Sequence, residues 1–333
     1  IYFDAFWSKY KQQSEAMNIL ITGGCGFIGS NLIKFILEQK PEEVSKVVNL
    51  DSLTYASDFK NTDSFSGHPK YIFEKADLCD IGNLRKIIFN HNITHIIHLA
   101  AESHVDNSIK DASAFVQSNI VGTFNLLKIC LESSIRRLHH VSTDEVYGDL
   151  GPEGKFSEHT PYDPRNPYSA SKAASDMLVR AYHHTYGLPV TISNCSNNYG
   201  PNQHREKFVP TVINRIMAGA KVPLYGAGTN IRDWIYVEDH CSAVWEVFTR
   251  GRAGETYCIG ADCERKNIEV IEEICNIMNA DPSKSIEYVE DRLGHDQRYA
   301  IDSNKIISEL QWRPKTGFID GLRKTVEWYG EKN

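Results

Sequence analysis

Asn18-Ile-Leu-Ile-Thr-Gly-Gly-Cys-Gly-Phe-Ile-Gly-Ser30 decides how the chain folds, because an apolar stretch runs directly into closely spaced glycines and then into a helical pattern. Gly23 can make the tight turn after the strand, Gly26 lets the backbone approach a pyrophosphate, and Gly29 lets the helix pack closely on the sheet. Amide groups at the start of the helix would face the phosphates. The stretch predicts a dinucleotide-binding turn, although glycines at this spacing also occur in ordinary turns.

A second apolar stretch strengthens the nucleotide-binding interpretation. Lys46-Val-Val-Asn-Leu-Asp51 ends in an acid about 20 residues after the last glycine of the turn. A carboxylate at this place can accept hydrogen bonds from the ribose hydroxyls of adenosine. Asp51 therefore favours NAD over NADP.

Length, charge and composition bound the possible functions. The chain has 333 residues and a net charge of −7, and its length predicts one large two-lobed unit or two domains. The acidic balance gives no general reason to bind nucleic acid or an anionic membrane, so an anionic ligand needs a local site. Eight cysteines without a C-x-x-C pair favour reduced thiols over disulfides or zinc, and the thirteen histidines show no metal-ligand pattern, so we expect no metal.

The N-terminus carries no recognisable targeting signal. Residues 1–16 precede Met17 and lack the charged and then apolar layout of a signal peptide, so we treat them as an extension, native or artificial. No apolar run approaches the length needed to cross a bilayer. We expect a cytoplasmic protein.

Apolar strands alternate with helical patterns along the first half of the chain. This rhythm predicts an α/β fold, a doubly wound parallel sheet of the Rossmann type. The further predicted strands are 71–73, 95–99, 138–142 and 190–193, and the predicted helices are 84–89, 115–131 and 169–186.

The rhythm changes near residue 194, where longer loops separate helices expected at 209–218, 268–278 and 318–329. This half predicts a smaller α+β lobe beside the first, with a cleft between them. We place the first lobe at 17–193 and the second at 194–333. A strand over 232–237 could return to the first lobe, and 232–258 could belong there, so the boundary is approximate.

Two groups of residues suggest chemistry. Tyr168 and Lys172 lie four residues apart, on one face of a predicted helix. A lysine cation, helped by the charge of a bound nicotinamide, favours the phenolate form of a nearby tyrosine. Thr143, Asp144 and Glu145 end a predicted buried strand, and two adjacent acids there can act as acid and base if their environments separate their pKa values. Without a catalytic role, Tyr168 and Lys172 would be an ordinary pair on the surface of a helix, and Asp144 and Glu145 would cap the turn after the strand.

From Met17 onward the chain resembles the extended short-chain dehydrogenase/reductase family, and within it the nucleotide-sugar 4,6-dehydratases that act on dTDP-glucose. The resemblance rests on the glycine turn, on His98-Leu-Ala-Ala-Glu-Ser-His-Val-Asp106, Ser142-Thr-Asp-Glu-Val-Tyr-Gly148 and Tyr168-Ser-Ala-Ser-Lys172, and on residues 195–201, 231–240 and 291–302. Sibling epimerases share the glycines and the Tyr/Lys pair, so the Thr-Asp-Glu triplet is the specific part.

The resemblance implies a three-stage reaction on one bound NAD that is regenerated in each turnover. Tyr168, assisted by Thr143 and Lys172, would take the proton of the C4 hydroxyl while the C4 hydride is transferred. Glu145 would then remove the C5 proton while Asp144 protonates the departing C6 hydroxyl. Return of the hydride to C6 and reprotonation of C5 would then leave a 4-keto-6-deoxy sugar and regenerated NAD+.

The resemblance also assigns binding residues. The NAD site would comprise Gly23, Gly26, Phe27, Ile28, Gly29, Asp51, Ser52, Leu53, Thr54, Asp77, Leu78, Leu99, Ala100, Ala101, Ser118, Tyr168, Lys172 and Asn198. The nucleotide-sugar site would comprise Ser103, Thr143, Asn197, Lys207, Phe208, Pro223, Leu224, Tyr225, Arg232, Asn267, His295, Arg298 and Tyr299. The family usually forms homodimers through two helices of the cofactor lobe, here 115–131 and 169–186.

The chain departs from the family pattern at three places on the expected nucleotide-sugar side. Asn202-Gln-His-Arg205 replaces an aromatic, proline-containing segment, Gln297 stands where a second arginine is usual, and Leu293 stands where proline is frequent. These departures leave UDP-sugars open as alternative substrates. An epimerase on the same scaffold also stays open, although an epimerase has no use for the acid at Asp144. A nucleotide-binding protein without turnover is a third alternative, and it would not need Tyr168, Lys172 and Glu145.

Overall fold

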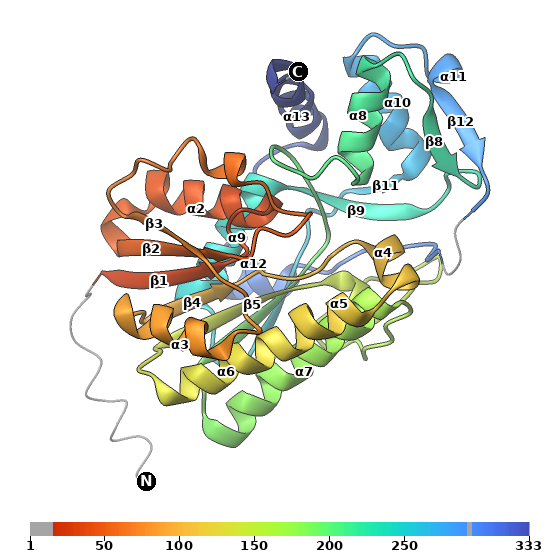
Figure 1. The fold of residues 1–333 in the computed structure, drawn as a ribbon. Helices are drawn as coiled ribbons and strands as arrows, with labels where there is room; N and C mark the ends of the chain where they lie inside the picture. Colours follow the sequence, from red (N-terminus) through yellow and green to blue (C-terminus); the bar gives the residue numbers. More distant parts are fainter. Residues whose placement is uncertain (1–15, 292–294, 333) are drawn as a thin grey trace.

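A seven-stranded parallel sheet forms the centre of the computed structural model (Figure 1), which describes residues 16–291 and 295–332. The N-terminal extension before residue 16 and Leu293 lie outside these ranges. The strand order is β10-β6-β5-β4-β1-β2-β3, and every neighbouring pair is parallel. The strands are β1 (Met17–Thr22), β2 (Val44–Asp51), β3 (Tyr71–Lys75), β4 (His95–His98), β5 (Arg137–Thr143), β6 (Val190–Cys195) and β10 (Thr256–Ile259).

Helices cover both faces of this sheet (Figure 1). On one face α2 (Phe27–Gln39) and α9 (Val237–Arg250) bury Leu32, Ile36 and Trp245 against β1. The opposite face is covered by α3 (Ile81–Asn90), α6 (Gly122–Glu132) and α7 (Pro167–Tyr186). Two apolar cores on the two faces of a parallel sheet confirm the doubly wound α/β fold.

A long helical segment precedes β5. It consists of α5 (Ser113–Phe115), the π-helical turn η3 (Val116–Val121) and α6, and it has the length and mean hydropathy of a membrane span. It is not a continuous apolar run, because Gln117, Asn119 and Lys128 interrupt it. Half of the segment is buried inside the fold, as is usual for a core helix.

The second lobe packs around its own core. Three helices, α8 (Phe208–Met217), α10 (Asn267–Ile277) and α13 (Phe318–Lys332), surround a small sheet in the order β11-β9-β7. Its strands are β7 (Asn197–Tyr199), β9 (Ile231–Tyr236) and β11 (Glu264–Lys266), and β8 (Val222–Tyr225) pairs with β12 (Ile286–Val289). The remaining elements are α4 (Val105–Lys110), α11 (Pro282–Ser285), α12 (Asn304–Leu310) and the 3-10 turns η1 (Pro41–Glu43), η2 (Phe59–Thr62) and η4 (Asp144–Tyr147).

The chain returns to the large sheet later than the sequence suggested. β9 pairs with β7 and β11 in the small sheet, so the expected return of a strand over 232–237 is wrong. The return begins with α9, which packs on α2, and continues with β10 at the edge of the large sheet. The boundary set at residue 193 also falls inside β6. A division of the chain at these points stays a proposal.

The glycine turn between β1 and α2 owes its shape to close backbone contacts. Gly23 has a φ of +74°, and a Cβ added there would lie 2.8 Å from the Cα of Ala100. A Cβ added at Gly29 would lie 2.2 Å from the carbonyl oxygen of Gly23. Side chains at these two positions are therefore excluded by contacts with backbone, which cannot rotate away.

We predict that Gly29→Ala lowers the free energy of unfolding by about 1–3 kcal/mol, because the added methyl group forces the turn and α2 apart. Equilibrium unfolding in urea measures this loss. Gly67→Ala is the matched control, since a Cβ there meets no described atom within 4 Å. The control is expected to change stability by less than about 0.5 kcal/mol. Equal stability of the two variants would contradict the packing account.

Candidate active site

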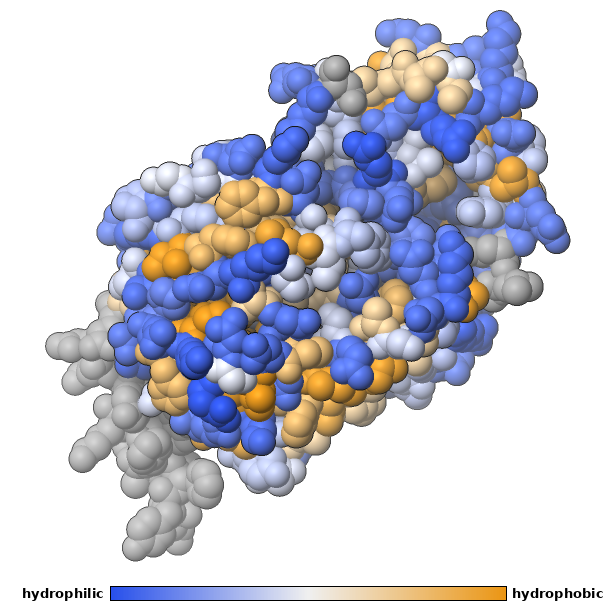
Figure 2. Space-filling view, in the orientation of Figure 1, coloured by the Kyte–Doolittle hydropathy of each residue, from blue (hydrophilic) through white to orange (hydrophobic). Residues whose placement is uncertain are grey.

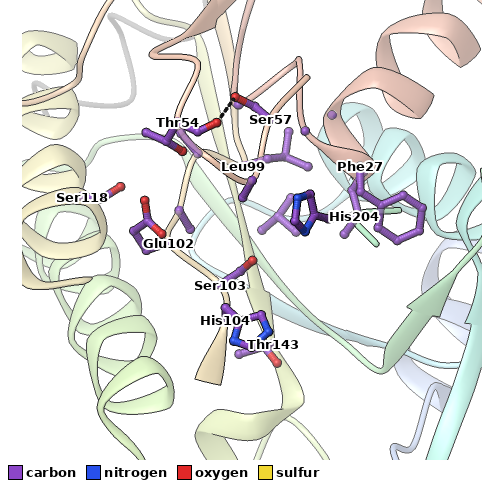
Figure 3. Close-up of a pocket in the computed structure, with 18 of the residues that line it drawn as sticks. Phe27, Thr54, Ser57, Leu99, Glu102, Ser103, His104, Ser118, Thr143 and His204 are labelled. Carbon is purple, nitrogen blue, oxygen red and sulfur yellow. Dashed lines mark hydrogen bonds between the residues drawn. The ribbon is translucent and has the colours of Figure 1, made fainter. Parts of the chain in front are cut away.

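A pocket opens at the carboxyl ends of the central strands, the edge at which doubly wound sheets bind ligands (Figure 3). Phe27 of the glycine turn, Leu99 after β4 and Thr143 at the end of β5 reach it from three separate elements. Of the eighteen residues expected to bind NAD, only Leu53 is absent from its lining. All five expected catalytic residues line it as well, together with Ser103, Asn197 and Lys207.

Asp51 is held by the turn that it was expected to accompany. Its buried carboxylate accepts hydrogen bonds from the backbone amides of Cys25 (2.9 Å) and Leu53 (2.8 Å). Leu53 therefore shapes the pocket through its backbone. A carboxylate has about four acceptor sites, so Asp51 retains capacity for ribose hydroxyls.

Tyr168 and Lys172 are placed by the start of α7. The side chain of Asn166 accepts a hydrogen bond from the amide of Ser169 at 2.8 Å, and the Ser169 hydroxyl accepts one from the amide of Asn166. This capping box and Pro167 fix where the helix begins. Lys172 donates a hydrogen bond from Nζ to the carbonyl oxygen of Val141 at 2.8 Å, which ties α7 to β5.

Burial governs the protonation state of Tyr168. Burial and the negative charge of Glu145 raise the pKa of Tyr168 well above its usual value, and the hydrogen bond with Thr143 lowers it only in part. Burial also lowers the pKa of Lys172. The protein alone therefore favours the neutral phenol, and the phenolate stays a prediction for the site that holds the positively charged nicotinamide.

Asp144 and Glu145 occupy different environments in η4. The Asp144 side chain is 2 % exposed, and burial together with the charges of Glu145 and Asp233 raises its pKa well above the usual value. Glu145 is only partly buried, and its amide donates a hydrogen bond to the hydroxyl of Thr143. A carboxyl group that stays protonated can act as a general acid beside a second carboxylate that acts as a base.

Several buried polar atoms of the pocket are unpaired. Asp144 Oδ2, Ser196 Oγ, Asn197 Oδ1 and Asn198 Oδ1 have no hydrogen-bond partner within the described ranges. Buried polar groups are normally paired, so these atoms indicate a polar ligand. Together with the glycine turn and Asp51, the residues present fit a dinucleotide beside a sugar.

The remaining residues expected to bind the nucleotide-sugar lie outside this pocket. Arg232 stacks on the ring of Tyr299 at 4.2 Å and donates a hydrogen bond to the carbonyl oxygen of Asp296. Arg298 forms two hydrogen bonds with the carboxylate of Glu264, at 2.7 and 2.9 Å. These arginines already have partners, so binding a pyrophosphate requires Arg298 to exchange Glu264 for phosphate.

Other members of this set are core residues or lie at the rim of the small lobe. The side chains of Phe208 and Leu224 pack in the core of that lobe, so Leu224 could meet a ligand only through its backbone. His295 contacts Asp291 at 2.6 Å and lies edge-on to the exposed ring of Tyr225. Pro223 and Asn267 lie in β8 and at the start of α10.

Two residues of the departing segment Asn202–Arg205 contact the first lobe, on the side of the pocket where the cofactor is expected. Asn202 donates a hydrogen bond to the hydroxyl of Ser30 in α2, and His204 lies edge-on to Tyr55 in the loop after β2. The expectation that this whole segment faces the nucleotide-sugar is wrong for these two residues. Gln297 does lie in the second lobe, where its backbone amide donates a hydrogen bond to the carboxylate of Asp149.

Sequence reasoning missed several side chains that line the pocket, among them Tyr55, Glu102, His104 and His204. Glu102, His104 and His204 are drawn around the pocket together with the expected Ser118 (Figure 3). Glu102 and His104 belong to the stretch 98–106 that supported the family resemblance, and Tyr55 follows the expected Thr54. His204 has no comparable signal, because its place depends on how the loop folds back.

Comparisons with known proteins agree with this site. A family model described as GDP-mannose 4,6 dehydratase matches residues 20–325. A dTDP-glucose 4,6-dehydratase from Haemophilus influenzae is 48% identical over 333 residues, covering 94% of this chain and 98% of that protein.

Solved structures include both an enzyme of this kind and an epimerase. DesIV, a dTDP-glucose 4,6-dehydratase from Streptomyces venezuelae crystallised with NAD and a second ligand, is 44% identical with a TM-score of 0.92, covering 95% of this chain and 97% of that one. A UDP-glucose 4-epimerase from Thermotoga maritima has a TM-score of 0.88 at 26% identity, covering 95% and 99%. From the matched family model and a relative close to half identical over nearly its whole length, the chain belongs to the nucleotide-sugar 4,6-dehydratases of the extended short-chain dehydrogenase/reductase family.

Proposed function

We propose that the chain is an NAD-dependent dTDP-glucose 4,6-dehydratase that forms dTDP-4-keto-6-deoxyglucose. The observation that carries the proposal is one pocket in which a dinucleotide-binding turn meets the Tyr168/Lys172 pair and two neighbouring carboxyl groups, one buried and one partly buried. Two of the relatives named above, from Haemophilus influenzae and Streptomyces venezuelae, have this activity according to their names, and the first matches nearly the whole chain.

Each residue of the pocket has a role that suits its environment. Bound NAD+ would hold the C4 hydride until its return to C6 and supply the positive charge that ionises Tyr168. Tyr168 then takes the proton of the C4 hydroxyl, and Thr143 shares that hydrogen bond. The C4 ketone acidifies the C5 hydrogen, which Glu145 removes. Protonated Asp144 gives its proton to the C6 hydroxyl, which leaves as water.

Ser103, Asn197 and Lys207 lie where the sugar and its pyrophosphate would enter. Lys207 donates a hydrogen bond from Nζ to the carbonyl oxygen of Ser103 at 2.7 Å, which joins the second lobe to the loop after β4. Arg232, Arg298 and Tyr299 would bind farther along the nucleotide. The epimerase alternative is disfavoured by Asp144, because a buried protonated acid at C6 serves no step of epimerisation.

Product analysis tests the reaction and the nucleotide together. We expect mass spectrometry after incubation with dTDP-glucose to show the loss of one water, and no loss from UDP-glucose or UDP-N-acetylglucosamine. Loss of water from a uridine sugar would instead mean that the protein prefers UDP-sugars, and the region around Gln297 would be the candidate origin of this changed specificity. An unchanged mass with a changed sugar configuration by NMR would contradict the dehydratase proposal in favour of an epimerase.

Asp144→Asn is expected to separate oxidation from dehydration. The variant keeps Tyr168 and Lys172, so C4 oxidation should continue, but it lacks the proton donor for the C6 hydroxyl. Elimination should therefore slow by about 100-fold or more, and enzyme-bound NADH should accumulate. Absorbance at the NADH band during a single turnover measures this. Tyr168→Phe is the control, because it blocks the first step and should give no NADH. A bound substrate without an NADH signal in Asp144→Asn would contradict the role of Asp144.

We propose that the chain forms a homodimer through α6 and α7. Large apolar side chains are exposed along this face, and Figure 2 shows them as a band over these helices. A contiguous exposed apolar surface commonly marks a protein interface. The residues are Ile109, Val116, Phe124, Leu131, Met177 and Tyr186.

Substitution of one methionine tests the dimer. Met177→Lys places a charge in the proposed interface and is expected to shift the protein toward monomer by at least about tenfold in dissociation constant, which corresponds to about 1.4 kcal/mol. Light scattering after size-exclusion chromatography measures the mass. Met217→Lys, at a comparably exposed methionine in α8 of the second lobe, should leave the dimer intact. A monomeric unsubstituted protein would contradict the proposal.

We also propose a cytoplasmic location. The eight cysteines are free, and six of them are buried as ordinary apolar side chains. This use of cysteine suits a reducing compartment. It is also where nucleotide-sugars and NAD are available together.

A further inference from the structure

One face of α7 carries a third ionisable residue besides the two already discussed. Tyr168, Lys172 and Asp176 follow one another at intervals of four residues, so their side chains leave the helix on the same side. Asp176 is completely buried, and Lys172 is 4 % exposed. A buried carboxylate needs compensation, and the proposed reaction steps do not use this one.

Asp176 is contacted by four side chains from three segments: β5, β6 and the loop before α7. The hydroxyls of Ser142 and Tyr162 each donate a hydrogen bond to Oδ2 at 2.8 Å, and Nδ2 of Asn194 donates a longer one at 3.4 Å. The other oxygen, Oδ1, lies 3.1 Å from Nε2 of His140. Burial alone would raise the pKa of Asp176, but these partners and the charge of Lys172 lower it below the usual value. Asp176 is therefore ionised.

His140 lies between the two charges. Its Nε2 is 3.1 Å from Asp176 Oδ1 and 3.5 Å from Lys172 Nζ. Burial lowers the pKa of His140, so the ring is neutral. Nε2 is shared by the two contacts: with its proton it donates to Asp176 Oδ1, and without its proton it accepts from Lys172 Nζ.

Lys172 depends on a negative charge because it is buried. Burial lowers the pKa of Lys172, and Asp176 is the largest influence that raises it. Other ionisable groups also face this cluster: His98, whose ring lies 5.1 Å from that of His140, and Cys195, His139, Tyr147 and Tyr162. All are uncharged here, because burial lowers the pKa values of His98 and His139, raises those of Tyr147 and Tyr162, and raises that of Cys195 to about 12.

We propose that Asp176 is a positioning residue for the reaction, which acts through His140 to keep Lys172 in its ammonium form one helical turn from Tyr168. The inference rests on the proposed function, since it explains how the lysine that activates Tyr168 stays charged in a closed site. A buried ion pair separated by a neutral imidazole leaves the ammonium without a carboxylate in direct contact. Lys172 can then act on Tyr168 and the ligand.

The test compares two variants of Asp176 by the pH dependence of C4 oxidation, followed as NADH formation in a single turnover with dTDP-glucose. Asp176→Asn keeps the shape but removes the charge, so Lys172 loses its proton at lower pH. We expect the alkaline limb of the rate profile to move down by about one pH unit or more, a loss of about tenfold on that limb. Asp176→Glu keeps the charge and should leave the limb in place, even if the rate falls.

A purely structural role predicts a different result. Both variants would then lower the rate or the melting temperature without moving the limb, and that outcome overturns the inference. Tyr162→Phe is a further control, because it removes one neutral donor from the same carboxylate and keeps every charge, so its limb should not move.

A second variant covers the case in which Asp176→Asn does not fold. Asp176→Ser also removes the charge, with a smaller polar side chain, and the alkaline limb should again move down, whereas an unmoved limb in the folded variant overturns the inference. Failure of the proposed function is distinct from both outcomes, because the unsubstituted protein would then show no NADH signal and no loss of water.

Discussion

The backbone of the glycine turn packs directly on itself and on the end of β4, and the rest of the site depends on this close approach. A Cβ at Gly23 would collide with Ala100, and one at Gly29 would collide with the carbonyl oxygen of Gly23. The pocket floor is therefore made of backbone, which leaves room for a dinucleotide close to the ends of β4 and β5. Tyr168 and the Thr143–Glu145 triplet reach the same space only because these strand ends converge.

Two buried aspartates show how the same fold produces opposite acid–base behaviour. Asp144 is buried beside other carboxyl groups, which raises its pKa, and it keeps a proton. Asp176 is equally buried, but donors from β5, β6 and the loop before α7 surround it, and it stays ionised. Burial alone therefore does not decide the charge of a carboxyl group; the hydrogen-bond donors around it do. The proposed chemistry uses the first directly and the second through Lys172.

Much of the fold and part of the site could be predicted from the sequence, and the physical reasons differ from residue to residue. The strands of the large sheet are apolar runs bounded by turns, and the Tyr168/Lys172 pair is read from helical spacing, so both are local signals. Other features depend on contacts between segments that are distant in sequence, which local patterns do not predict. Examples are the pairing of β9 with β7 and β11, the ion pair of Arg298 with Glu264 and the contact of His204 with Tyr55. Asp176 follows Lys172 by one turn, yet only the packing of His140 and Ser142 against it reveals its environment.

Transfer of a label within one turnover tests the central claim most directly. If the hydride removed from C4 is held in the closed pocket and returned at C6, dTDP-glucose deuterated at C4 should give a 4-keto-6-deoxy product whose methyl group carries that deuterium, in ordinary water. NMR and mass spectrometry of the product locate the label. Deuterium retained at C4, or a methyl group that lacks it, would contradict the account.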